Sequence, residues 1–155
     1  MAMHDMNSRY KPVLEFIGAY TTTQTPSSGV DTRGFEAVVA QITIGTITDI
    51  ANSPYGHWTF KAQESDSESA SFTDITDSNQ ILIDSSKSPV VAPDSSTGVF
   101  LTVDAASEDD QVYSVGILTT KRYVRIVATA VDTPGSTPIA VHILLGDPAQ
   151  QPTAH

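Results

Sequence analysis

The sequence predicts an all-β protein folded as a two-sheet β-sandwich of the jelly-roll type. From Val30 onward, apolar and polar residues alternate with a period of two in successive short segments, which is the pattern of half-buried strands. Clusters of Gly, Pro, Asp and Ser separate these segments, and no long segment follows the periodicity of a helix. A set of about eight short strands with alternating faces favours a sandwich, with the jelly roll as its leading topology.

Each predicted strand carries an apolar side and a polar side. Their ranges are 34–47, 57–63, 72–75, 80–83, 98–103, 113–117, 122–131 and 139–145. In the second of them Trp58 alternates in phase with Phe60 and Ala62, so we expect Trp58 to be buried. The Pro- and Gly-containing segment 132–138 joins the last two strands, and we expect these two strands to pair as a hairpin.

Three parts of the chain differ in composition. Residues 1–28 are predicted to form an extended N-terminal arm, because a polar start and a Thr-rich end enclose only a short apolar patch. Residues 29–146 form the predicted sandwich domain, and residues 147–155 form a polar C-terminal tail. Such an arm becomes ordered by lying on a neighbouring molecule, and a frayed terminus is the alternative interpretation.

Charge and composition exclude several classes of protein. The 155 residues include 18 acidic and 8 basic side chains, and the net charge of −10 disfavours binding to nucleic acid or to an anionic membrane. A basic protein surface is the electrostatic partner that this charge suits. The absence of cysteine excludes disulfides and thiolate metal sites and fits synthesis in a reducing cytoplasm. We expect neither a membrane-spanning segment nor a secretory signal.

We also expect no enzymatic activity and no bound metal or cofactor. The acidic residues fall in predicted loops, where carboxylates are usually solvated. The run Glu64–Glu68 has alternating oxygen donors for calcium, but it lacks the glycine and the distal Glu of an EF-hand loop. The histidines have no metal-binding spacing, and neither a nucleophile elbow nor a phosphate-binding loop is present.

One basic cluster stands out against the acidic background, formed by Lys121, Arg122 and Arg125. On a strand these side chains are placed to pair with acids across the sheet, which is the interpretation that we favour. Anchoring an acidic patch on a partner protein is the alternative.

Several segments resemble small structural proteins from the virions of tailed bacteriophages. The residues that carry this resemblance are Val30–Val38, Trp58–Asp66, Phe72–Ile75 and Lys121–Ile126, and the likeness covers roughly residues 30–146. A strand followed by Glu-Ser-Asp and then by Phe-Thr-Asp is similar to the discoidin-like or jelly-roll modules of phage particles. The segment Ser67–Ala70 departs from them, because it lacks the glycine usual at this turn.

The resemblance implies a head decoration, or cement, protein. Such proteins sit on the outer capsid surface of the virion, often as homotrimers, and clamp neighbouring subunits of the major capsid protein. Head–tail connector components and tail structural subunits are the alternatives within this class. A carbohydrate-binding module that stacks sugars on Trp58, Tyr55 or Tyr113 is the alternative from another class.

The predicted arm supplies the residues that we expect to contact a partner. An apolar patch and the tyrosine after it would anchor the arm on a neighbouring subunit. These residues are Val13, Leu14, Phe16, Ile17 and Tyr20. Because the arm is placed outside the domain, we expect removal of residues 1–28 to leave a folded domain that no longer binds the capsid.

Overall fold

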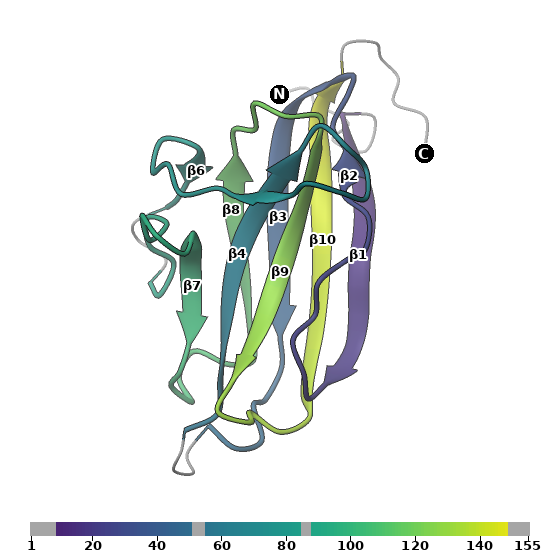
Figure 1. Ribbon diagram of the computed structural model, residues 1–155. Helices are drawn as coiled ribbons and strands as arrows, with labels where there is room; N and C mark the ends of the chain where they lie inside the picture. The colour runs from purple at the N-terminus through teal and green to yellow at the C-terminus, as the bar shows by residue number, and fades with distance from the viewer. Residues whose placement is uncertain (1–8, 51–54, 85–87, 149–155) are drawn as a thin grey trace, which may run out of the picture.

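Two antiparallel sheets, packed face to face, form the part of the chain that this computed structural model describes, residues 9–50, 55–84 and 88–148 (Figure 1). The strands are β1 (Tyr10–Tyr20), β2 (Val30–Asp31), β3 (Phe35–Ile44), β4 (His57–Ser65), β5 (Thr73–Asp74), β6 (Ile81–Leu82), β7 (Val99–Val103), β8 (Gln111–Ile117), β9 (Tyr123–Val131) and β10 (Thr137–Pro148). The predicted all-β class is confirmed, and each predicted strand overlaps one of β3 to β10. Within these ranges no helix is long and apolar enough to cross a membrane.

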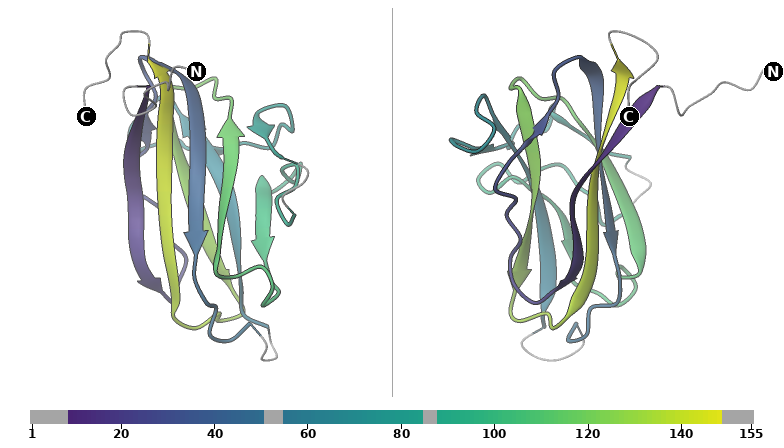
Figure 2. Two further views of the ribbon diagram at one scale, coloured as in Figure 1. Left: turned by 180° about the vertical axis from the view of Figure 1, so that it is seen from behind. Right: turned by 90° about the vertical axis from the view of Figure 1, so that its right-hand side faces the viewer.

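The strand order is that of a jelly roll. One sheet has the order β1-β10-β3-β8-β6, and the other has the order β2-β9-β4-β5, with β7 also paired to β4. The pairing is nested, because β1 pairs with β10, β2 with β9 and β3 with β8. The right-hand view of Figure 2 shows the two sheets as separate layers. Nested pairing across two layers confirms the predicted topology.

The core lies between the sheets and comes from the inward side of each strand. Alternate residues of β3, β4 and β10 are buried, as the period-two geometry of a strand requires. Trp58, Phe60 and Phe100 have no exposed area, and burial of side chains of this size contributes about 2–3 kcal/mol each. The predicted burial of Trp58 is therefore confirmed.

The N-terminal segment is extended as expected, but from Tyr10 onward it belongs to the sandwich. β1 runs antiparallel to β10, with Tyr10 opposite Gly146 and Tyr20 opposite Thr137. Residues 1–8 lie outside the described ranges. The predicted boundary after residue 28 therefore does not separate an arm from the domain in the part of the chain that is described. Removing residues 1–28 would remove the first strand of the jelly roll.

After β1 the chain crosses to the other sheet and covers its edge. Gln24 forms an isolated bridge with Ala128, and β2 pairs with the start of β9. Near the end of β9, the backbone N–H of Ala130 donates a hydrogen bond to the hydroxyl oxygen of Thr23 at 3.1 Å. The segment shows no alternation in the sequence because its backbone and hydroxyl groups, and not an apolar side, hold it in place.

The predicted hairpin between the last two strands is wrong. β9 lies in the sheet with β4, and β10 lies in the sheet with β3, so the connection crosses from one layer to the other. Asp132, Thr133 and Gly135 have φ values of 50°, 56° and 73°, and these positive values turn the chain out of the sheet that contains β9. Alternation shows which side of each strand is buried, but it does not say which sheet the strand joins.

The C-terminal strand is longer than predicted. β10 spans Thr137–Pro148, with Pro148 opposite Phe35, so it includes the first residues of the predicted polar tail. The rest of that tail, residues 149–155, lies outside the described ranges.

Phe16→Ala is expected to destabilise the fold by about 2–3 kcal/mol, whereas Ile17→Ala changes stability by less than about 0.5 kcal/mol. Phe16 packs against the core, while its neighbour Ile17 is 65% exposed. Urea unfolding at protein concentrations low enough that only single chains are present, followed by the fluorescence of the single tryptophan, gives both values. Equal and small effects would show that β1 adds nothing to the stability of the sandwich.

Candidate protein-binding face

The outer surface of the sheet β1-β10-β3-β8-β6 carries no Asp, Glu, Lys or Arg at the strand positions that point outward. These positions alternate with the buried ones, and strand pairing aligns them across the sheet. They are Tyr10, Pro12, Leu14, Ile17, Ala19, Ala37, Val39, Gln41, Thr43, Leu82, Val112, Ser114, Gly116, Pro138, Ala140, His142, Leu144 and Gly146. We call this surface the uncharged face.

Apolar residues on the uncharged face continue from one edge of the sheet to the other. One row passes from Pro12 through Leu144, Val39 and Gly116 to Leu82. At its far end Leu82 packs closely over Gly116, where an added Cβ atom would lie 3.1 Å from the Cβ atom of Leu82. The charged residues of the described strands, in a chain with a net charge of −10, therefore lie on other surfaces. Contiguous apolar surfaces of this kind are typical of sites that contact other molecules.

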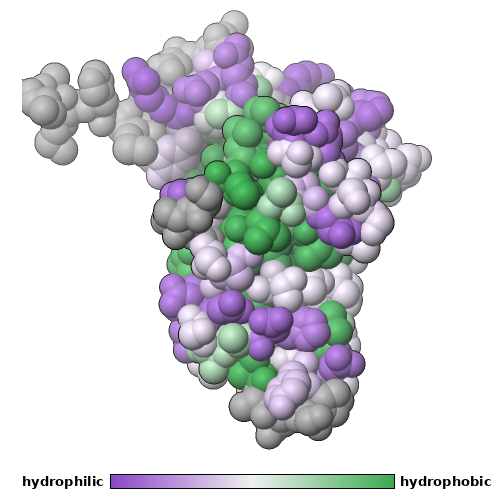
Figure 3. Space-filling view, turned by 90° about the vertical axis from the view of Figure 1, so that its left-hand side faces the viewer, coloured by the Kyte–Doolittle hydropathy of each residue, from purple (hydrophilic) through white to green (hydrophobic). Residues whose placement is uncertain are grey.

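Exposed apolar residues also extend beyond Leu82, onto the side of the molecule that carries β6, β7 and β8. Figure 3 shows hydrophobic residues gathered in the middle of this side, with hydrophilic residues around them. Leu82, Leu118 and Val91 are 52%, 50% and 55% exposed. A hydrophobic centre within a polar rim is the usual anatomy of a protein interface.

The uncharged face is not flat. Ala37 and Gly146, which have little or no side chain, lie in a hollow of about 610 Å³ whose lining includes Tyr10, Pro12 and Leu144. Most of the exposed lining of this hollow is apolar. A surface with such relief selects a partner whose projecting side chains fit it.

The residues predicted to bind a partner are divided between the two sides of β1. Leu14 and Ile17 point outward from the sheet and are 51% and 65% exposed. Val13, Phe16 and Tyr20 pack against the core, and the rings of Phe16 and Tyr20 meet edge to face with centroids 5.7 Å apart. Of the predicted set, Leu14 and Ile17 are thus the two that another molecule can reach.

The contributions of β3 and β10 to this face were not anticipated from the sequence. The sequence placed Val39 and Leu144 on strands but did not mark them as residues that bind a partner. Both strands lack Asp, Glu, Lys and Arg at their outward positions. A strand of an antiparallel sheet normally has polar residues on its solvated side. Neighbouring strands whose outward positions hold no Asp, Glu, Lys or Arg therefore indicate a covered outer surface. The lack of charge at these positions was visible in the sequence, but the pairing of β3 with β10 was not.

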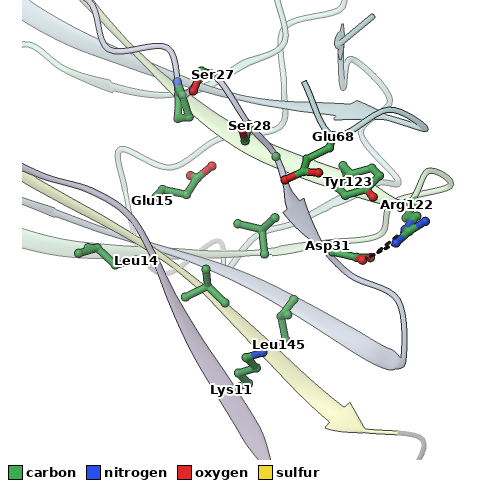
Figure 4. Close-up of a pocket in the computed structure, with 14 residues that line it drawn as sticks. Lys11, Leu14, Glu15, Ser27, Ser28, Asp31, Glu68, Arg122, Tyr123 and Leu145 are labelled. Atoms are coloured by element: carbon green, nitrogen blue, oxygen red, sulfur yellow. Dashed lines mark hydrogen bonds and ion pairs between the residues drawn. The ribbon is translucent and has the colours of Figure 1, made fainter. Parts of the chain in front are cut away.

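A polar cleft lies at the β1 edge of the molecule, between β1 and the segment that leads into β2 (Figure 4). It has a volume of about 690 Å³, and its charged lining residues are Lys11, Glu15, Asp31, Glu68 and Arg122. Arg122 donates two hydrogen bonds to Asp31, at 3.1 and 2.7 Å, and this contact lowers the pKa of Asp31. These bonds tie β2 to β9, so we interpret the cleft as the seam where the N-terminal segment closes the sandwich.

Glu15 closes the same seam from β1. A register shift between Leu14 and Phe16 leaves Glu15 without a partner on β10, which is the geometry of a β-bulge. Its carboxylate accepts the backbone N–H of Ile126 on β9, at 3.2 and 3.0 Å for the two oxygens. Burial raises the pKa of Glu15 to about 8, against the opposing effects of the Ile126 N–H and of Arg125.

Two members of the basic cluster pair with acids within the chain, as the favoured interpretation expected, whereas Arg125 contacts an aromatic ring and neutral oxygens. Lys121 Nζ lies 2.8 Å from a carboxylate oxygen of Asp66. Arg122 forms the bonds to β2 described above, and the Arg125 guanidinium lies over the ring of Phe72, 3.9 Å from its centroid. All three side chains therefore have contacts within the chain, and the side chains of Lys121 and Arg122 are 41% and 39% exposed.

The acidic run considered for calcium is also used within the fold. Glu64 is buried and accepts hydrogen bonds from the Thr119 hydroxyl at 2.8 Å and from the Thr120 N–H at 3.0 Å. Asp66 forms the ion pair with Lys121. Across residues 9–50, 55–84 and 88–148, no three His, Cys, Asp or Glu side chains come together in a group that could hold a metal ion.

Of the aromatic residues considered for sugar stacking, two are buried. Trp58 has no exposed area, and Tyr113 is 6% exposed, with its hydroxyl donating to the carbonyl of Glu108 at 2.6 Å. Tyr55, which is 60% exposed, is the one that a ligand can reach. A stacking platform built from several of these aromatic rings is therefore not formed.

No protein-family model, curated protein sequence or solved structure matches this chain. The functional interpretation rests on the fold and on the surface. Together they define a jelly-roll sandwich with one uncharged sheet face, and this face is the candidate functional site.

Glu15→Gln is expected to stabilise the protein by on the order of 3 kcal/mol at pH 9 and to have little effect at pH 4. Because the pKa of Glu15 is raised from 4.5 to about 8 on folding, the folded wild type loses stability as pH rises through that interval. Gln keeps an oxygen acceptor for Ile126 but does not ionise. Chemical unfolding across this pH range measures the difference, with Glu68→Gln, an exposed lining residue of the same cleft, as control. Parallel pH profiles for wild type and Glu15→Gln would contradict the assignment.

Proposed function

We propose that this protein is a virion structural protein of a tailed bacteriophage, and specifically a head decoration protein that binds the lattice of the major capsid protein. The uncharged face is the observation that carries the proposal. A sheet that is apolar on its inner side and uncharged on its outer side is suited to contact with another protein. The resemblance of residues 30–146 to phage virion proteins supports this particular assembly.

Contact through a broad face suits a protein that is repeated over a lattice. Burial of apolar surface contributes about 25 cal/mol per Å², but association also costs entropy, so a single contact of moderate area binds weakly. A decoration protein makes several such contacts at once, and linking them raises the effective concentration of each. The acidic remainder of the surface, with its net charge of −10, favours solubility of the assembled particle.

A head–tail connector component or a tail subunit would use the same kind of face. These alternatives differ from a decoration protein in position and in the number of copies, and not in the chemistry of the contact. The interior position of Trp58 and Tyr113 removes the main support for a carbohydrate-binding module.

Virions of the phage that encodes this chain are expected to carry the protein over the whole head, in numbers that match the symmetry positions of the capsid lattice. Quantitative mass spectrometry of purified virions gives the copy number relative to the major capsid protein, and electron microscopy with an antibody label gives the position. Label confined to one vertex or to the tail would assign the protein to the connector or the tail. Absence from purified virions would contradict the proposal.

A further inference from the structure

We propose that a second copy of this chain covers the uncharged face, so that the protein forms a two-fold symmetric dimer in which two β1-β10-β3-β8 surfaces pack against each other. This inference rests on the proposed function in one respect, since it treats the same face as a protein-binding surface, and it names a second copy of the chain as the occupant. The dimer would then contact the capsid through the exposed apolar residues on the side that carries β6, β7 and β8 (Figure 3). Sheets commonly pack face to face in proteins, with an interior about 10 Å thick between them.

The distribution of charge favours a copy of the chain over a basic partner. A basic partner would be recognised by acidic side chains, and the uncharged face offers none at its outward strand positions. The opposite sheet differs, because Lys61 and Asp74 form an ion pair on it at 2.9 Å. Two copies of net charge −10 repel each other least when their uncharged surfaces meet and their charged surfaces face away.

The size of the face fits one copy of itself. Four neighbouring strands, about 4.8 Å apart and about ten residues long, cover roughly 600 Å² in outline. Standard stable interfaces bury about 800 Å² on each partner, and projecting side chains present more area than their flat outline. One face packed on an identical face therefore approaches the area that a stable dimer needs.

The relief of the face is suited to self-packing. Leu14 and Ile17 project from β1, and the hollow at Ala37 and Gly146 lies on the same face, toward the Tyr10 end of that strand. In a two-fold symmetric dimer every contact occurs twice, so the projecting residues of each copy can enter the hollow of the other copy. Addition of a strand at the β1 edge is less favourable, because Pro12 and the bulge at Glu15 interrupt that edge.

Two-fold packing closes after two copies, since each copy uses the same surface. The homotrimer implied by the resemblance would instead need two different surfaces on each copy. The inference therefore makes the dimer, and not the trimer, the unit that forms through this face.

Sedimentation velocity of the full chain is expected to show a dimer that becomes tighter as salt is added, because salt screens the repulsion between two acidic copies. Ile17→Asp is expected to weaken the dimer by about a hundredfold or more, since each copy would bury an unpaired carboxylate. Tyr55→Asp is the matched control, because Tyr55 is 60% exposed and lies in the loop before β4, outside the uncharged face. Circular dichroism confirms that each variant keeps its β-sheet signal.

A second experiment, thiol cross-linking, tests the same dimer interface without weakening it. The chain has no cysteine, so a single introduced thiol reports its own surroundings. Thr43→Cys places the thiol on the uncharged face, and Thr59→Cys places it on the outer side of the opposite sheet. A short bifunctional thiol cross-linker is expected to give covalent dimers with Thr43→Cys and not with Thr59→Cys.

The possible outcomes separate this inference from the proposed function. A monomeric or trimeric wild type, or a dimer unaffected by Ile17→Asp and cross-linked equally by both thiols, would overturn the inference. A monomer that binds capsids through Leu14 and Ile17 would also overturn it, while leaving the decoration role in place. A dimer with the expected variant pattern that is absent from virions would support the inference and contradict the proposed function.

Discussion

Pairing between the first strand and the last is the interaction on which the rest of the structure depends. Because β1 lies along β10, Val13 and Phe16 add to the core, while Leu14 and Ile17 add to the outer surface. The pairing ends at Tyr20, from where the chain crosses to the other sheet and provides partners for the edge of β9. Both the uncharged face and the closed seam therefore follow from one ladder of backbone hydrogen bonds.

The bulge in β1 separates the two roles of this strand. Regular alternation after Leu14 would place Phe16 outward and Ile17 inward. The extra residue, Glu15, reverses that phase, so the large aromatic ring reaches the core and the aliphatic side chain reaches the surface. It also directs a carboxylate to the Ile126 N–H, which neither β2 nor the bridge at Gln24 pairs. The raised pKa of Glu15 is the consequence of placing an acid in this partly buried position.

The two outer surfaces of the sandwich are built for different surroundings. The sheet that contains β4 and β9 carries the Lys61–Asp74 pair and the contact between Arg125 and Gln63 at 2.8 Å. Such half-exposed pairs add little to stability, but they suit a surface in contact with water. The uncharged face of the other sheet has no such contacts at its outward positions, because those positions hold small, aliphatic or neutral polar residues. This difference between two otherwise similar sheets is the basis for assigning binding to one of them.

The sequence by itself determined the fold class, the approximate positions of β3 to β10 and the burial of Trp58, because alternation directly reports which side of a strand is inside. It also marked an apolar patch at the start of the chain, but it did not separate the exposed Leu14 and Ile17 from Val13, Phe16 and Tyr20, which pack against the core. Only the tertiary structure decided that β9 and β10 join different sheets and that residues 10–31 belong to the sandwich, since strand pairing joins residues far apart in the chain. The same reason applies to the uncharged face, which is assembled from strands at opposite ends of the sequence and exists only once β1, β10 and β3 lie side by side.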